Sequence, residues 1–366
     1  MKRKPSFGRL LILASFIALA PAALASTWYV DGVNGNNENN CQTRKTACKT
    51  IGHAISLASS GDSIMVAPAI YKETLTINFS LKLIGADAAT TIVDGGGSDG
   101  GTVISVSSSA GSVVLSKMTL RNGGAGIVNS GALRVDDSTI SGNSPGGGVE
   151  NDGAITLDRS TVRGNSASGI DGYYSNAGGI YNEGTLTVND STISDNSAVG
   201  NYVCGGGIYN AGTLTINNST INGNQASGES NSSGGGIDNE GAVVLNNSTL
   251  TGNSATIYGG DGYGGGISYG GCVEASSYAY ATTLRNSIVA DNKAGNCYGT
   301  MTSKGYNLSS DDTCHFKSTG DLNNTHPKLG PWRTTADRRR PGLSSWEARR
   351  LTPATRAAVP TARVIF

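Results

Sequence analysis

GIVNSGALRVDDSTISGN, at residues 126–143, is the stretch that decides the fold, because the same pattern returns along the chain. Each copy reads as Gly, an aliphatic residue, any residue, Asn, a short apolar stretch, Ser-Thr and a final Asn. Repeats of this size form stacked units that bury their apolar side chains against their neighbours. Further copies begin at Gly148, Gly179, Gly207 and Gly236, and a degenerate copy begins at Gly266.

The repeat is too short for a helical solenoid. Its shortest period, from Ile127 to Val149, is 22 residues, which cannot hold a pair of helices. β-Branched residues dominate the apolar positions, and apolar residues alternate locally, as at Leu133 and Val135. We therefore expect an all-β fold, a single-stranded right-handed parallel β-helix with three short strands per coil and one row of variable segments leaving a single corner.

Identical polar residues recur at equivalent positions, which predicts ladders of hydrogen bonds along the stack. A glycosylation role for sequons such as Asn218 and Asn247 is less favoured than this structural role. One predicted ladder is Asn129, Asn151, Asn182, Asn210 and Asn239; a second is Asn143, Asn165, Asn196, Asn224 and Asn253; a third is Ser138, Ser160, Ser191, Ser219 and Ser248.

The first 25 residues are predicted to be a cleaved signal peptide. Basic residues lead into the apolar stretch 10–20, and Ala23 to Ala25 are typical of a cleavage site. No later apolar run is long enough for a membrane helix. We therefore expect an exported mature chain with no transmembrane segment.

Residues 26–62 are predicted to cap the start of the β-helix, which then occupies residues 63–330. The segment holds a short helix with four apolar residues on one face, which we expect to cover the first coil. His53 on this helix is expected to be solvated. The four apolar residues are Ile51, Ala54, Ile55 and Ala58.

The charge balance excludes nucleic acid as a partner. Residues 26–330 carry 15 Lys and Arg against 25 Asp and Glu, a net charge of −10. Nucleic acids and anionic lipid surfaces both require a basic footprint. Residues 331–366 hold eight of the sixteen arginines, but they lack the repeat.

Six cysteines in an exported chain predict disulfides. Cys41 and Cys48 are close neighbours, and Cys297 and Cys314 bracket one loop, so we expect these two bridges. For Cys204 and Cys272 a bridge and free thiols are both open.

The charged residues that precede Ser-Thr in neighbouring repeats are the candidates for a catalytic group. Glycoside hydrolysis needs paired carboxylates, and elimination needs Ca²⁺ ligands and a base. Later copies place Asn at these positions, and the histidines at 53, 315 and 326 lie outside the repeated strands. We expect no catalysis, no metal and no cofactor. The candidates are Asp136, Asp137, Asp158, Arg159 and Asp190.

Tyrosines in the variable segments are the candidate glycan-binding residues. Aromatic rings beside a polar surface suit stacking on sugars or contact with protein. Packing of single exposed tyrosines on loop glycines is the alternative. The five are Tyr173, Tyr174, Tyr202, Tyr258 and Tyr263.

WYVDGVNG at residues 28–35 and CKTIGHAISLASSGDSIMVAPAIYKETLTI at residues 48–77 resemble the N-terminal segment of secreted bacterial right-handed parallel β-helix proteins of the pectin-lyase-like superfamily. Residues 285–331 are similar to the closing segment of the choice-of-anchor Q group. The GGGI and Asn spacing also resembles the repeats of polymorphic outer membrane proteins, although Ile, Val or Leu replaces their usual Phe.

Residues 331–366 depart from this resemblance. Suitable codons for residue 332 onward, read one base back, give a continuation similar to that of the choice-of-anchor Q group. We infer a frameshift in the gene or its assembly and expect an aberrant, disordered basic tail.

These observations predict an exported cell-surface or extracellular monomer that binds a polysaccharide or a cell-surface component by adhesion or glycan binding. The alternative is a pectate-lyase-like polysaccharide lyase or a hydrolase acting on acidic polysaccharide, and only the lyase would use Ca²⁺.

Overall fold

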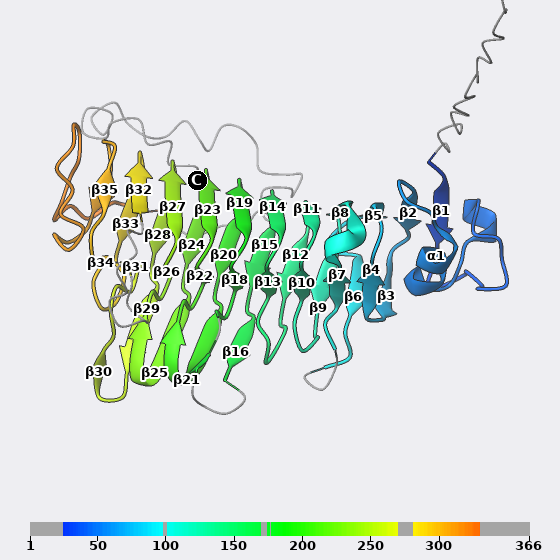
Figure 1. The fold of residues 1–366 in the computed structure, drawn as a ribbon, viewed down its shortest axis with the longest axis horizontal. Coiled ribbons are helices and arrows are strands. Elements are labelled where there is room, and N and C mark those ends of the chain that lie inside the picture. Colours follow the sequence, from blue (N-terminus) through cyan, green and yellow to red (C-terminus); the bar gives the residue numbers. More distant parts are fainter. Residues whose placement is uncertain (1–24, 98–100, 170–173, 176, 270–280, 330–366) are drawn as a thin grey trace, which may run out of the picture.

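The computed structural model describes residues 25–97, 101–169, 174–175, 177–269 and 281–329, which form one right-handed parallel β-helix (Figure 1). Three long parallel sheets, called A, B and C, run along the rod. A typical coil contributes its strands in the order C, A, B, as β10, β11 and β12 do (Ile127–Asn129, Ala132–Asp136 and Thr139–Ser141). A fourth sheet, D, follows sheet B in four successive coils. The predicted fold class is confirmed.

The strands of sheet A are β1 (Thr27–Val30), β2 (Ser63–Val66), β5 (Leu81–Gly85), β8 (Ser112–Ser116), β11, β14 (Ala154–Asp158), β19 (Thr185–Asn189), β23 (Thr213–Asn217), β27 (Ala242–Asn246), β32 (Ala281–Arg285) and β35 (Thr302–Ser303). Those of sheet B are β3 (Ala69–Lys72), β6 (Thr91–Asp94), β9 (Thr119–Arg121), β12, β15 (Thr161–Arg163), β20 (Thr192–Ser194), β24 (Thr220–Asn222), β28 (Thr249–Thr251), β33 (Ile288–Ala290) and β36 (Leu308–Ser309).

The strands of sheet C are β4 (Leu75–Ile77), β7 (Ile104–Val106), β10, β13 (Val149–Asn151), β18 (Ile180–Asn182), β22 (Ile208–Asn210), β26 (Ile237–Asn239), β31 (Ile267–Tyr269) and β34 (Cys297–Tyr298). Sheet D contains β16 (Ser166–Ser168), β17 (Tyr174–Ser175), β21 (Ser197–Cys204), β25 (Gln225–Ser233), β29 (Ser254–Ile257) and β30 (Gly260–Asp261). The helices are α1 (Ile51–Leu57) and two 3-10 turns, Arg44–Thr46 and Ser108–Ala110.

The repeated aliphatic residue lies inside the rod and stacks on its equivalents. Ile127, Val149, Ile180, Ile208 and Ile237 pair in register across sheet C, and each is at most 2% exposed. The alternation of apolar and polar residues therefore divides each strand into a core side and an outer side, as predicted.

The glycine before each sheet C strand is required by the close approach of successive coils. A Cβ on Gly179 would lie 2.3 Å from the carbonyl oxygen of Gly207 in the next coil. No side chain fits at that distance, so the repeat keeps glycine at this position.

The predicted asparagine ladders are confirmed. In the first ladder each amide Nδ2 from Asn129 to Asn210 donates to the Oδ1 one coil later, at 2.8 Å from Asn129 to Asn151, and Asn239 donates to the Thr282 hydroxyl. The second ladder continues beyond its predicted end, from Asn253 to Asn292. In the serine ladder, the acceptor is the hydroxyl and the donor is a backbone N–H, as from Ser138 to Ser160.

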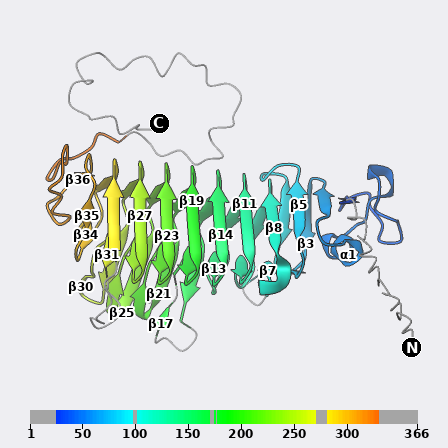
Figure 2. The same ribbon diagram turned by 45° about the horizontal axis from the view of Figure 1, so that its top comes forward.

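The variable segments form a sheet, where loops were predicted. Strands β21, β25 and β29 pair in parallel, and Figures 1 and 2 show them projecting as a fin from one side of the rod. Ala198, Val203 and Ala226 form a small core within this fin. Each coil satisfies the backbone hydrogen bonds of the next, which an isolated loop would leave to water. We call sheet D the fin.

The first strand begins earlier than predicted, because β1 lies within the segment expected to act only as a cap. One edge of β1 pairs with β2. The other is covered: Tyr29 N–H donates to the Cys41 carbonyl, and Cys48 N–H donates to the Tyr29 carbonyl. Helix α1 buries Ile51 completely against the first coils. In the described part of the chain, no helix is long and apolar enough to cross a membrane.

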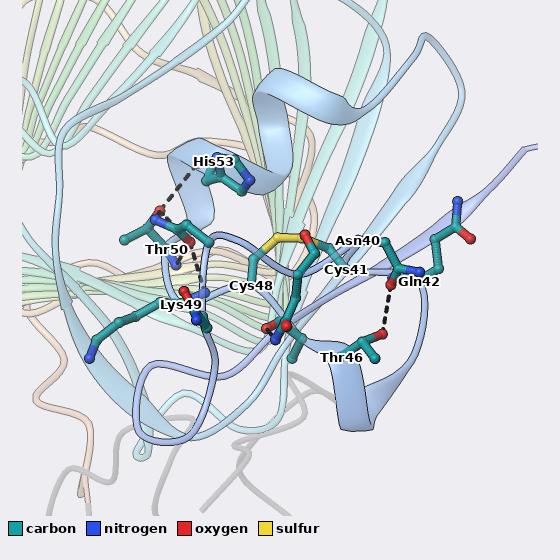
Figure 3. Close-up of a disulfide and its surroundings, with 12 residues drawn as sticks. Asn40, Cys41, Gln42, Thr46, Cys48, Lys49, Thr50 and His53 are labelled. Carbon is teal, nitrogen blue, oxygen red and sulfur yellow. Dashed lines mark hydrogen bonds between the residues drawn. A yellow bond between two sulfur atoms is a disulfide. The ribbon is translucent and has the colours of Figure 1, made fainter.

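Both predicted disulfides are present, with Cα–Cα distances of 5.0 Å for Cys41–Cys48 and 4.9 Å for Cys297–Cys314. Cys204 is also disulfide-bonded, so the free-thiol alternative is wrong for it. Cys272 lies outside the described residues. His53 lies close to the first disulfide (Figure 3), but bonded sulfurs provide no thiolate ligands, so this group is not a metal site.

Candidate functional site

The predicted catalytic residues lie where sheet A ends and the chain turns toward sheet B. Asp136 and Asp158 are paired neighbours at the ends of β11 and β14. Arg134 contacts both carboxylates at 2.8 Å. Arg159 contacts Asp137 at 3.0 Å and also Asp158. Two guanidinium groups and three carboxylates therefore form one closed ion-pair network.

This network is poorly suited to lyase chemistry. The hydrogen bond from Arg159 to Asp137 raises the pKa of Arg159, and that from Arg134 to Asp136 raises the pKa of Arg134. Both arginines stay protonated and cannot act as bases. The carboxylates that would hold Ca²⁺ already face cations.

Asp190 does not join the network, since it makes no ion pair with any described residue. It occupies a left-handed turn position with φ 48°, equivalent to Asp137 at 51° and Arg159 at 49°. Asn218 and Asn247 follow at the same turn, both with φ 51°. Asn and Asp tolerate this conformation best, so this position serves the turn.

The predicted glycan-binding tyrosines that the structure describes lie on or next to the fin. Tyr173 lies outside the described residues, and Tyr174 pairs with Tyr202 in the backbone register of β17 and β21. Tyr258 is 90% exposed beside the β29–β30 hairpin. Tyr263 packs on Tyr298 of sheet C, with ring centroids 4.8 Å apart.

A second aromatic group, which the sequence analysis did not single out, lies on the outer side of sheet C. Tyr181 and Tyr209 are paired in register on β18 and β22, and their rings stack at 5.0 Å with 15° between planes. The Tyr181 hydroxyl donates to Glu183 at 2.5 Å, and the Tyr209 hydroxyl donates to Glu240 at 2.7 Å. Glu150 is the register neighbour of Tyr181 on β13. We call these five residues the tyrosine face.

Two acidic groups of the tyrosine face, Glu150 and Glu240, have raised pKa values. Burial raises the pKa of Glu150, and the nearby carboxylates Asp152 and Glu183 raise it further. Burial also raises the pKa of Glu240, against the opposing effect of the hydrogen bond from Tyr209. Burial, together with the adjacent glutamates, raises the pKa of both tyrosines, which stay neutral. The face thus presents neutral phenols beside closely spaced carboxyls.

A signal for this face was present in the repeat. The residue between the buried aliphatic and the ladder Asn must point outward, because side chains alternate along a strand. In successive coils this position holds Val128, Glu150, Tyr181, Tyr209 and Asp238. Comparing these positions alone would have revealed the tyrosine pair.

The histidines lie away from both groups. His53 is on α1, and His326 contacts Asp291 at 3.1 Å near the last coils. His315 lines a hollow of about 330 Å³ in the C-terminal segment, with Lys317 and Met301. No histidine therefore accompanies the carboxylates of the tyrosine face.

No protein-family model and no curated protein matches the chain. Several solved structures are similar in fold. Pectate lyase Pel9A gives a TM-score of 0.47 at 14% identity, covering 82% of this chain and 80% of that one. The GH136 lacto-N-biosidase from Eubacterium ramulus gives 0.44 at 10% identity, covering 81% and 66%. Pectin methylesterase PemA from Erwinia chrysanthemi gives 0.39 at 15% identity, covering 71% and 94%. None of these similarities identifies a ligand of this chain.

Proposed function

We propose that this protein is an exported, monomeric β-helix that binds glycans at the cell surface or outside the cell without converting them. The observation that carries the proposal is the stacked pair Tyr181 and Tyr209 on the outer side of sheet C. Aromatic rings flanked by hydrogen-bonding carboxylates suit the apolar faces and hydroxyl groups of sugars.

Sheet C offers a glycan a second aromatic contact beyond the tyrosine face. Tyr209 and Tyr298 occupy the same outward position on β22 and β34, three strand spacings apart. Three spacings amount to about 14 Å. Asp238 and Ser268, at the same position on the two strands between them, are fully buried, so the tyrosine face and the packed pair Tyr298–Tyr263 would be two separate contacts for a glycan. Tyr202 on β21 would extend the surface over the fin.

Binding without turnover is supported by the closed ion-pair network around Asp158, which leaves neither a free base nor an uncompensated Ca²⁺ site there. A second candidate function is glycoside hydrolysis at the tyrosine face. The raised pKa of Glu150 favours it, because a carboxyl whose pKa is raised beside Glu183 resembles the general acid and its partner carboxylate.

Export, surface location and membership of the choice-of-anchor Q group belong to the same proposal. The signal-peptide pattern of residues 1–25 supports export, as do the disulfides, which persist in oxidising compartments. The resemblance of residues 285–331 supports the group.

Calorimetry with oligosaccharides found by a glycan array tests the function. A Tyr181→Ala/Tyr209→Ala variant is expected to bind about tenfold more weakly, since it loses both rings. The control is Tyr306→Ala, which removes a 47% exposed ring that belongs neither to the tyrosine face nor to the candidate tyrosines and is expected to leave affinity unchanged. Equal affinity of the double variant and the wild type would contradict the proposal.

A reducing-end assay on the same oligosaccharides separates binding from hydrolysis. We expect no release of sugar ends. Steady release that Glu150→Gln abolishes while binding persists would establish the hydrolase instead. Formation of unsaturated uronate from pectate, lost in Arg159→Ala, would establish the lyase.

A further inference from the structure

We infer that the glycan bound at the tyrosine face is cationic, an oligomer of hexosamines whose amino groups are free. This inference rests on the proposed function and adds the charge of the ligand. It is carried by the stacked tyrosines together with the sign of the charged side chains beside them.

The charged side chains along this part of sheet C are all carboxylates. Glu150 occupies the outward position of β13, and Asp152, Glu183 and Glu240 follow the ladder asparagines, whereas Asp238 at the outward position of β26 is fully buried. From β7 to β31, neither position holds Lys or Arg at any described residue. A glycan rich in uronates would therefore meet only like charge at these positions.

The tyrosines make this surface more specific for an amino sugar than carboxylates alone would be. Their hydroxyl protons are committed to Glu183 and Glu240, so each phenol oxygen keeps its acceptor capacity toward a ligand. An ammonium group can contact these oxygens, the electron-rich rings and the carboxylates together. A neutral sugar would use the rings but leave the carboxylates without a cation.

Burial adds to this preference. The pKa of Glu150 is raised by burial and then by its acidic neighbours, so its ionised form is held at a cost in the free protein. A bound ammonium group offsets that cost. The same argument applies to Glu240, which the Tyr209 hydroxyl contacts.

The experiment measures by calorimetry the affinity of the full chain for three oligosaccharides of equal length. They are a fully deacetylated glucosamine oligomer, its N-acetylated form and an oligogalacturonate. We expect the deacetylated oligomer to bind at least about tenfold more tightly than the other two, and added salt to reduce its affinity.

Single substitutions of glutamate by glutamine test which carboxylates contribute to the preference for a cationic glycan. Glu183→Gln and Glu240→Gln are expected to weaken the deacetylated oligomer about threefold to tenfold, and by a larger factor than they weaken the N-acetylated one. Glu229→Gln removes an exposed carboxylate on the fin and is the matched control. Tyr209→Phe keeps the ring and serves as a milder variant if a glutamine variant melts early.

The outcomes distinguish a failure of the cationic preference from a failure of glycan binding itself. Equal or tighter binding of the N-acetylated or galacturonate oligomer overturns the cationic preference and leaves glycan binding standing. Binding of Ca²⁺ alone at these glutamates, with no preference among the oligomers, also overturns it. If none of these oligomers and no saccharide on the array binds, the inference and the proposed function both fail.

Discussion

Replacing Asn196 by Ala should show how much one rung of an asparagine ladder stabilises the rod. Asn196 is fully buried, and its amide makes four hydrogen bonds. Its Oδ1 accepts from the backbone N–H and the Nδ2 of Asn165, both at 3.0 Å. Its Nδ2 donates to the Val162 carbonyl at 3.1 Å and to Asn224 Oδ1 at 2.9 Å.

The expected loss follows from the groups left without this partner. Truncation removes a donor or acceptor from two backbone groups and two amides in a packed interior. A buried polar group that loses its partner costs about 1–3 kcal/mol, and some of these groups keep a second bond. We therefore expect the free energy of unfolding to fall by about 3 kcal/mol.

The assay is urea unfolding followed by far-UV circular dichroism, with Asn217→Ala as the matched control. Asn217 belongs to an outer amide ladder, bonded to Asn189 at 2.9 Å and to Asn246 at 3.0 Å, but it is partly exposed. Water can replace its bonds, so its loss should cost less than about 1 kcal/mol. If Asn196→Ala destabilises the protein no more than Asn217→Ala does, the ladder is not a source of stability.

Three further predictions concern the ends of the chain. Asp62 accepts hydrogen bonds from Trp28, Ser59 and Ser26, which lower its pKa although burial alone would raise it. Asp62→Asn should therefore lower the free energy of unfolding by about 2 kcal/mol at neutral pH. This difference between variant and wild type should vanish as pH falls through the lowered pKa of Asp62, below about 4. A difference that does not change with pH would contradict this. Replacing Cys297 and Cys314 by Ser should lower stability by about 3 kcal/mol in urea titrations, whereas a smaller loss than that of a surface double variant would argue against the bridge. Deleting residues 332–366, outside the described residues, should leave the melting temperature unchanged, and a clear drop would show that the tail packs.

The tertiary structure alone decided the charge network and the fin. Arg134 was not a candidate, because nothing in its own repeat shows that it reaches Asp158 one coil away. Pairing between coils depends on side-chain reach across the stack, which a sequence period does not contain. The variable segments likewise differ in length and sequence, so their pairing into sheet D depends on neighbouring coils projecting from the same corner.

The sequence by itself determined which residues face the core and which positions carry the ladders. A coil repeats its geometry, so a residue that recurs once per coil must meet its own equivalent, as Ile180 meets Ile208 and Asn182 meets Asn210. Function follows the outward positions, where the coils differ. The repeat itself places Tyr181 opposite Tyr209, whereas the ring stacking and the glutamates that accept from the two hydroxyls depend on side-chain direction, which only the stacked coils show.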